Sequence, residues 1–224
     1  MVRKGVFCKI LMAKRKSFVV VGIDLAGSSR RPTGICTLHG SRAQTHVGYG
    51  DEDILSAVAQ AQPDLVPMDA PLSLPKGRKS IHERTAEHLR ECDRELLRRR
   101  IKFFPITLGP MRMLTERGLA LKAKIDSLGY PTVECYPGAA QDLWKIPRQH
   151  QNLKGLLRGL EDLGVRGLKM ETTSDELDAV TAALVGRWFL MGRGEMLGGS
   201  EGILIPEIRV RTHRDRAISR RKPP

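Results

Sequence analysis

The feature that most constrains the fold is the apolar run at residues 18–25, in which the only charged side chain is that of Asp24. Valine and isoleucine dominate the run, and β-branched residues favour strands. Because apolar side chains occupy consecutive positions, neither face of such a strand suits water. The run therefore predicts a central strand buried on both faces, and 224 residues are enough to build a core around it.

The rest of the chain alternates between strand and helix patterns. β-Branched or apolar segments predict further strands at residues 33–38, 43–49, 64–68 and 131–135, with a short one at 203–205. Apolar residues at helical spacing predict helices at residues 51–61, 81–100, 111–128, 153–163 and 175–191. This order indicates one α/β domain over residues 18–207, between a basic N-terminal tail (1–17) and a basic C-terminal tail (208–224).

The net charge of +13 is concentrated in the two tails. Residues 1–17 carry six Lys or Arg residues and no acid, and residues 208–224 carry seven against one Asp. Between the tails the charge is nearly balanced, but residues 98–124 carry eight basic side chains against Glu116 alone. This basic segment is either a phosphate-binding surface or a set of solvated helix faces, and the sequence leaves both interpretations open.

Composition excludes several classes of protein. No apolar run reaches the ~18 residues that a membrane helix needs. The basic N-terminus lacks an uninterrupted apolar stretch, so we expect no secretory signal. The four cysteines are scattered without a CxxC pair, which argues against a zinc knuckle or a disulfide framework and is typical of a cytoplasmic protein.

Aspartates occupy positions where a charge is costly. Asp24 and Asp69 each end an apolar strand, and Asp175 and Asp178 lie three residues apart in the first turn of the last helix. Asp24 and Asp69 also suit turns, and Asp175 suits a helix start. Asp178 is harder to explain structurally, because the residues below it on the same side of the helix are apolar.

Carboxylates directed toward one place repel each other and lose hydration. A divalent cation removes that conflict, and Mg²⁺ or Mn²⁺ prefers such hard oxygen ligands. Two such ions would activate a water and stabilise the leaving oxygen of a phosphodiester. The interpretation requires that the first and fourth strands be neighbours and that the last helix cross them.

Four segments in order resemble the DUF429 family, which is regarded as a family of predicted nucleases with a ribonuclease H-like fold. They are residues 21–27 (VGIDLAG), 68–75 (MDAPLSLP), 134–142 (ECYPGAAQD) and 175–180 (DELDAV). The resemblance spans about residues 18–207 and implies an α/β fold, a ribonuclease H-like five-stranded mixed sheet flanked by helices. The implied strand order is 3-2-1-4-5, with only the second strand antiparallel.

By this resemblance, Asp24 is the first-strand aspartate and Asp69 the fourth-strand acid. Asp175 and Asp178 are similar to the D-x-x-D pair of the final helix in resolvase-like members. Glu134, on a fifth strand at the sheet edge, is a secondary candidate that ligates metal, binds substrate or holds the following turn.

The sequence thus predicts a metal-dependent nuclease with Mg²⁺ or Mn²⁺ as its cofactor. Asp24, Asp69 and Asp178 would be ligands together with Glu134, and Asp175 would complete or orient the site. Nucleic acid, DNA or RNA, would be the partner, and the basic segment would hold its phosphates. The candidate substrate-binding residues are Arg98, Arg99, Arg100, Lys102 and Arg112.

Three other functions fit the same residues. One is a noncatalytic module that binds nucleic acid or protein. Another is an actin-like phosphotransferase, which resembles the GIDLAGS segment at 22–28, although such enzymes use two domains of this kind. The last is a hydrolase of small phosphoesters.

The remaining histidines and aromatic residues are assigned no chemistry. His82, His88 and His150 lack partners at ligand spacing and are predicted on the surface. Aromatic residues make up only 4% of the chain, so they are expected in the core and not as stacking platforms for bases: Phe103, Phe104, Trp144 and Trp188.

Overall fold

The computed structural model describes residues 17–207. The two predicted basic tails therefore lie outside the described residues, apart from Ser17. The strands are β1 (Val19–Asp24), β2 (Thr33–His39), β3 (Arg42–Gly48), β4 (Val66–Asp69), β5 (Thr132–Cys135), β6 (Gly194–Leu197) and β7 (Ile203–Pro206). The helices are α2 (Asp51–Ala61), α3 (Glu91–Arg98), α4 (Gly109–Ser127), α5 (Pro137–Trp144), α6 (Leu153–Asp162) and α7 (Ser174–Leu190).

The strands form one mixed sheet in the order β3-β2-β1-β4-β5-β7-β6. β2 is antiparallel to both of its neighbours, and β4, β5 and β7 run parallel to β1. The predicted ribonuclease H-like order 3-2-1-4-5 with an antiparallel second strand is therefore confirmed.

Two predictions about the edge of the sheet were wrong. The sheet has seven strands and not five, so β5 lies between β4 and β7 and is not at an edge. In addition, β6 is a second antiparallel strand, paired with β7. β6 was not predicted, because four residues between glycine-containing turns carry too little periodicity to indicate a strand.

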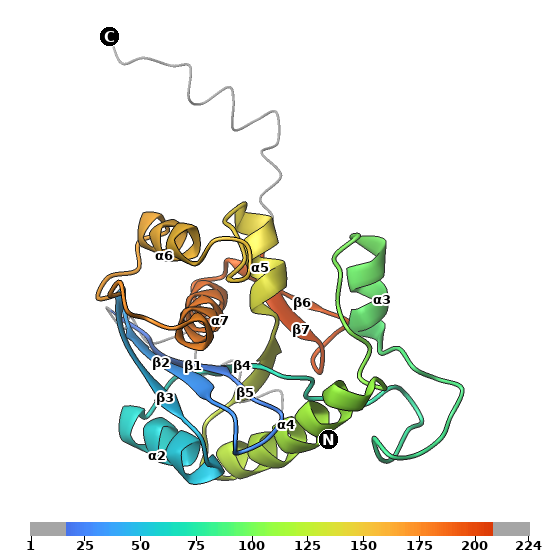
Figure 1. The fold of residues 1–224 in the computed structure, drawn as a ribbon. Helices are drawn as coiled ribbons and strands as arrows, with labels where there is room; N and C mark the ends of the chain where they lie inside the picture. Colours follow the sequence, from blue (N-terminus) through green and yellow to red (C-terminus); the bar gives the residue numbers. More distant parts are fainter. Residues whose placement is uncertain (1–16, 208–224) are drawn as a thin grey trace.

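Helices cover both faces of the sheet (Figure 1). α5, α6 and α7 lie on one face, and α2 and α4 lie on the other. β1 packs in both directions, with Val20 in the α7-side core and Val21 and Ile23 in the core beneath α2 and α4. All three side chains are fully buried, as the apolar run predicted.

The helix predicted at 81–100 is shorter in the structure, where only α3 (Glu91–Arg98) is helical. The buried Arg78 guanidinium donates hydrogen bonds to the carbonyls of Ile81, Glu83 and Glu87. These bonds hold the three carbonyls in an irregular loop, and bonds from one side chain to several nearby carbonyls leave no periodic signal in the sequence.

The sequence analysis did not predict α5. The signal that could have revealed this helix is Pro137 at its N-terminus. Proline suits the first helical position, because its missing N–H group would have no helical partner there. Of the aromatic residues expected in the core, Trp144 and Trp188 pack edge to face at 5.0 Å. Phe104 contradicts that expectation with a side chain that is 71% exposed.

No helix within residues 17–207 is long and apolar enough to span a bilayer. His82, His88 and His150 are exposed, as predicted.

Candidate functional site

Asp24 and Asp69 end adjacent parallel strands in the same register. They are directly paired positions on β1 and β4, so their side chains leave the sheet on the same face. That face is the α7 side, because Gly22, two residues before Asp24, contacts α7. Both aspartates are partly buried.

Two glycines let α7 lie directly on the sheet beside these aspartates. A Cβ atom at Gly34 would lie 2.0 Å from the backbone oxygen of Asp175, and one at Gly22 would lie 2.1 Å from that of Ala179. Any larger residue would therefore push the helix away. This close approach places the first turn of α7, with Asp175 and Asp178, over the ends of β1 and β2.

The start of α7 is fixed by the predicted capping box. The Thr173 hydroxyl accepts from the Glu176 N–H at 3.3 Å, and the Glu176 carboxylate accepts from the Thr173 N–H at 2.9 Å. Because the cap sets where the helix begins, it also sets which turn faces the strand ends.

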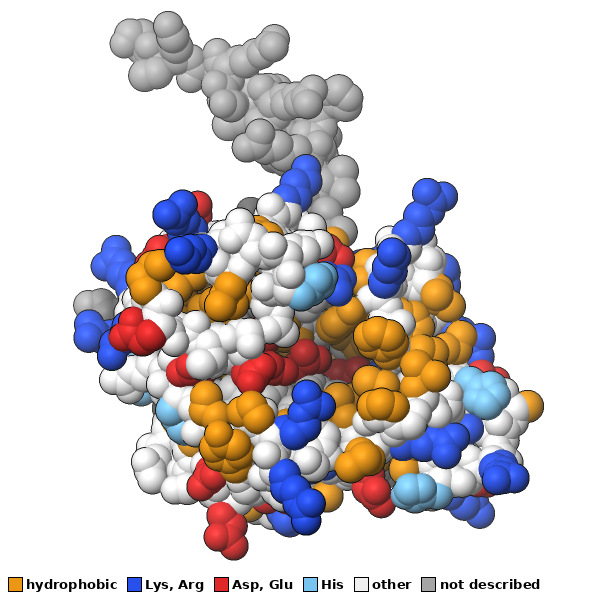
Figure 2. Space-filling model, viewed as in Figure 1, with side chains coloured by type: hydrophobic (Ala, Val, Ile, Leu, Met, Phe, Trp, Pro, Cys, Tyr) orange, Lys and Arg blue, Asp and Glu red, His pale blue; other side chains and the backbone are white. Residues whose placement is uncertain are grey.

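The structure thus brings together the four aspartates that the sequence singled out, and we call them the aspartate cluster: Asp24, Asp69, Asp175 and Asp178. In the space-filling view, acidic side chains gather in a hollow between the two helical layers (Figure 2).

The aspartates of the cluster repel one another electrostatically. Burial raises the pKa of Asp24 well above its usual value, and Asp69, Asp178 and Asp175 raise it further. Burial likewise raises the pKa of Asp69, with added repulsion from Asp178 and Glu134, against a smaller opposing effect of Arg148. Several charges held this close without a cation are unfavourable.

Asp178 differs from its neighbours because its carboxylate has two hydrogen-bond donors. Oδ1 accepts from the Gln141 amide at 2.6 Å, and Oδ2 accepts from the Gln149 amide at 2.9 Å. Burial raises the pKa of Asp178 to about 6, although the bond from Gln141 acts in the opposite direction.

Glu134 lies outside the aspartate cluster. It is paired with Met68 on β4, one position before Asp69, so the alternation of side chains places it on the opposite face of the sheet. Its carboxylate accepts two hydrogen bonds from Arg90, at 2.6 and 2.9 Å, and one from the Leu72 N–H at 2.8 Å. The carboxylate of Glu134 therefore holds the loop after β4 and does not face the aspartate cluster.

The residue of β5 that shares the face of Asp69 is Cys135, which sequence analysis did not single out. Its thiol is buried, and burial together with the negative charges of Asp69 and Glu134 raises the pKa of Cys135 well above its usual value. The Cys135 thiol is therefore an uncharged group on the same face of the sheet as Asp69.

The cluster fits a hard divalent cation in its chemistry, since it supplies only carboxylate oxygens in a repulsive setting. Within residues 17–207, no three His, Cys, Asp or Glu side chains are arranged so that they could hold a metal ion together. Each oxygen of Asp178 already accepts one hydrogen bond from an amide. Each oxygen has a second lone pair, so a bound cation would share these oxygens with the amides.

The basic segment is largely neutralised by neighbouring acids. Arg98 pairs with Glu91 and Glu95, and Arg99 pairs with Glu195. The other candidate substrate-binding side chains have no carboxylate partner among the described residues, and all of them are exposed: Arg100, Lys102 and Arg112.

Sequence analysis missed Arg31 and Gln149, which line one cavity together with Asp24 and Asp175. Arg31 is in the loop after β1, and Gln149 is in the loop after α5. His150 and Arg148, in that same loop, lie close enough to lower the pKa of Asp178. No spacing rule links these positions to the aspartates, because only the tertiary fold brings the loops together.

The strand order and the aspartate cluster define an α/β protein of the ribonuclease H-like class with a carboxylate-lined site at the strand ends. The family model described as "Protein of unknown function (DUF429)" matches residues 22–201, and the chain belongs to this family.

Two solved structures of RuvC from Thermus thermophilus are similar to this chain. The structure in complex with Holliday junction substrate has 15% sequence identity and a TM-score of 0.46, and the second RuvC structure has 15% and 0.43. Each comparison covers 78% of this chain and 96% of the RuvC chain. No curated protein matches the sequence.

Proposed function

We propose that this protein is a divalent-metal-dependent hydrolase of nucleic-acid phosphodiester bonds. The observation that carries the proposal is the aspartate cluster, in which residues from β1, β4 and α7 repel one another in a partly buried hollow. Maintaining such repulsion costs stability, and sites that shift pKa values through burial and like charges are frequently functional. Membership of the DUF429 family is compatible with this activity.

Bound Mg²⁺ or Mn²⁺ would polarise the phosphate and lower the pKa of an attacking water. Asp24, Asp69 and Asp178 would hold the cation. Asp175, which is less buried than Asp178 on the same helix, would orient the site. Water oxygen would bond to phosphorus, the bond from phosphorus to the leaving oxygen would break, and that oxygen would take up a proton. Arg112, Arg100 and Lys102 would hold backbone phosphates.

Replacement of one aspartate tests the proposal. Asp24→Asn should abolish Mg²⁺- or Mn²⁺-dependent cleavage of labelled single-stranded and duplex DNA and RNA, because the amide is a weak cation ligand. Its melting temperature should equal or exceed that of the parent, because repulsion within the cluster is relieved. Asp162→Asn, on the outer helix α6, is the matched control and should cleave normally. An Asp24→Asn variant that cleaves like the parent would overturn the assignment.

A second candidate function is a noncatalytic nucleic-acid-binding module. The amide hydrogen bonds of Asp178 favour it, because they stabilise this carboxylate without a cation. Such a module would bind polyanions in a salt-sensitive way that a chelator does not alter. Detectable Mn²⁺ binding that disappears in Asp24→Asn favours the hydrolase.

A further inference from the structure

A cavity of about 390 Å³ opens beside the aspartate cluster. Asp24 and Asp175 contribute to its lining, and the loop after β1 and the first turns of α4 form its sides. In Figure 2, hydrophobic side chains gather next to the acidic hollow on the same face of the molecule. The cavity is thus continuous with the proposed site of cleavage.

The two sides of the cavity differ in chemistry. The loop after β1 supplies Arg31, which is exposed and which no carboxylate of the described residues pairs with. α4 supplies Met111, Met113 and Leu114. The Met113 side chain is 56% exposed, although it is large and apolar.

Two further exposed apolar residues precede α4 in the chain. Leu108 is 45% exposed and Phe104 is 71% exposed. Exposed apolar side chains that gather around a cavity, as those beside the acidic hollow do in Figure 2, mark a binding surface. A ligand that fits here combines an apolar face with a negative group placed near Arg31.

We propose that this cavity receives one unpaired nucleotide of a nucleic-acid strand, with its base against Met113 and Leu114 and its phosphate at Arg31. The inference rests on the proposed function and adds a substrate class to it. The favoured substrate is a strand with an unpaired nucleotide next to the cleaved bond, not an uninterrupted duplex.

Size supports a single nucleotide. A volume of about 390 Å³ is at the lower end of small-molecule pockets, which span roughly 300–1,000 Å³. A nucleotide inside a duplex is stacked on both sides and paired, so turning its base into the cavity costs a few kcal/mol more than for an unpaired nucleotide. Methionine adapts to flat partners, and contact with a base face is sequence-tolerant. The cavity should therefore distinguish single-stranded from double-stranded nucleic acid more strongly than it distinguishes one base from another.

Binding of oligonucleotides by the full-length protein without metal tests the inference. Fluorescence anisotropy would compare a labelled single strand with the blunt duplex of the same sequence. We expect the single strand to bind about tenfold more tightly. Met113→Ser should reduce that preference by about fivefold, and Arg31→Ala should lower the salt slope for the strand by about 0.7.

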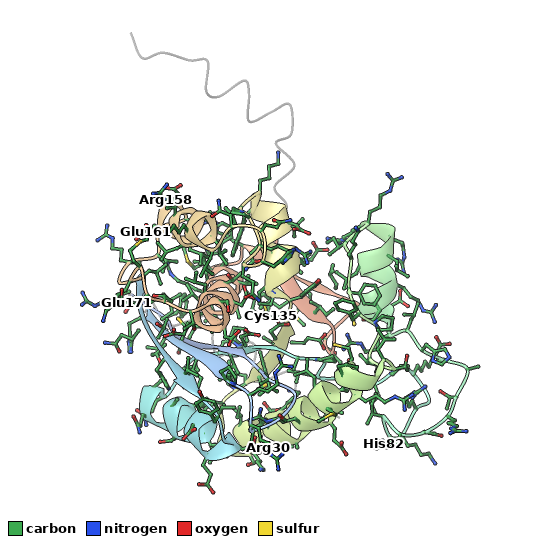
Figure 3. All side chains as sticks on the ribbon, in the orientation of Figure 1. Arg30, His82, Cys135, Arg158, Glu161 and Glu171 are labelled. Carbon is green, nitrogen blue, oxygen red and sulfur yellow. The ribbon has the colours of Figure 1, made fainter. Side chains whose placement is uncertain are left out.

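Two matched controls lie away from the cavity. Met170→Ser removes another exposed methionine, whose side chain is 67% exposed, and Arg158→Ala removes an arginine that projects from α6 (Figure 3). Both variants should retain the strand preference of the parent. All substituted side chains are exposed, and melting temperatures would verify that each variant is folded.

Equal binding of strand and duplex would overturn the inference, as would an unchanged preference in Met113→Ser. A mononucleotide that competes as well as the strand would also overturn it, because the cavity would then serve a small molecule. The readout involves no cleavage. A protein that shows the strand preference but no metal-dependent cleavage would contradict the proposed function and leave this inference standing.

Discussion

At the scale of the residue, Asp178 shows how a carboxylate is held in a place that burial disfavours. The amides of Gln141 and Gln149 stabilise its charged form, while burial and the neighbouring Asp175 raise its pKa to about 6. These amides would compete with a cation for the same two oxygens. Gln149 is the more easily displaced of the two, because it comes from a loop, whereas Gln141 is buried within α5.

Removing that competition should strengthen cation binding. Gln149→Ala frees Oδ2 of Asp178, and one net hydrogen bond is worth about 1 kcal/mol, so we expect Mn²⁺ to bind about fivefold more tightly. Isothermal titration calorimetry would measure the affinity. Gln60→Ala on α2, where the glutamine is exposed and bonds only Ser56, is the control. Unchanged or weaker Mn²⁺ binding in Gln149→Ala would show that the amide does not compete.

At the scale of the element, the position of α7 depends on glycines in the strands below it. Gly34→Ala would place a methyl group within 2.0 Å of the backbone of Asp175, so α7 must shift or the strand must bend. We expect a loss of stability of about 3 kcal/mol, with cleavage lost alongside it. Gly109→Ala is the control, because a Cβ atom there meets nothing within 4 Å. Chemical denaturation would measure both, and a Gly34→Ala variant as stable as the parent would disprove the close contact.

The loop after β4 depends on the buried ion pairs of Arg90. The Arg90 guanidinium bonds Asp93 and Glu134, and the side chains of all three are at most 5% exposed. Glu134 in turn accepts from the backbone N–H of Leu72, three residues after Asp69. This cluster therefore connects α3 and β5 to the segment that follows Asp69.

Glu134→Gln should destabilise the protein by about 3–5 kcal/mol, because it leaves a buried guanidinium partly unpaired. Glu195→Gln breaks the pair between Glu195 and Arg99, whose side chains are 39% and 30% exposed, and should cost no more than about 1 kcal/mol. Urea denaturation of the two variants measures the contrast. Equal losses would mean that burial does not distinguish these pairs.

At the scale of the whole molecule, the aspartate cluster should make stability fall as the pH rises. The pKa of Asp178 is about 6 in the folded protein, and burial also raises those of Asp24 and Asp69. The folded state therefore binds more protons than the unfolded state from about pH 4 upward, which gives a negative slope of stability against pH. The pKa values of Asp53, Glu176 and Glu195 are lowered by hydrogen bonds and act in the opposite direction at acidic pH.

Comparison of the parent with Asp178→Asn isolates the effect of one group. Relative to this variant, the metal-free parent should lose up to about 3 kcal/mol of stability between pH 4 and pH 7, since a pKa near 6 replaces one near 3.8. Denaturant titrations at a series of pH values would measure the difference. A difference that is independent of pH would show that Asp178 titrates normally.

Elements with local signals could be predicted from the amino-acid sequence alone. The apolar run predicted β1 as a strand buried on both faces, and the capping box predicted where α7 begins. The resemblance to the family added the order of the first five strands, which the structure confirms. The sequence also singled out the aspartates at the ends of these elements, because a charged residue that ends an apolar run can be recognised without coordinates.

Which of these residues come into contact depends on how the helices and strands pack together. Packing places Glu134 on the face opposite Asp69, where it bonds Arg90, and it brings Arg31 and Gln149 to the cavity beside Asp24. Periodicity along a chain reports burial, because burial repeats with each turn or pleat. It does not report a partner that lies tens of residues away, since that contact depends on how whole elements pack.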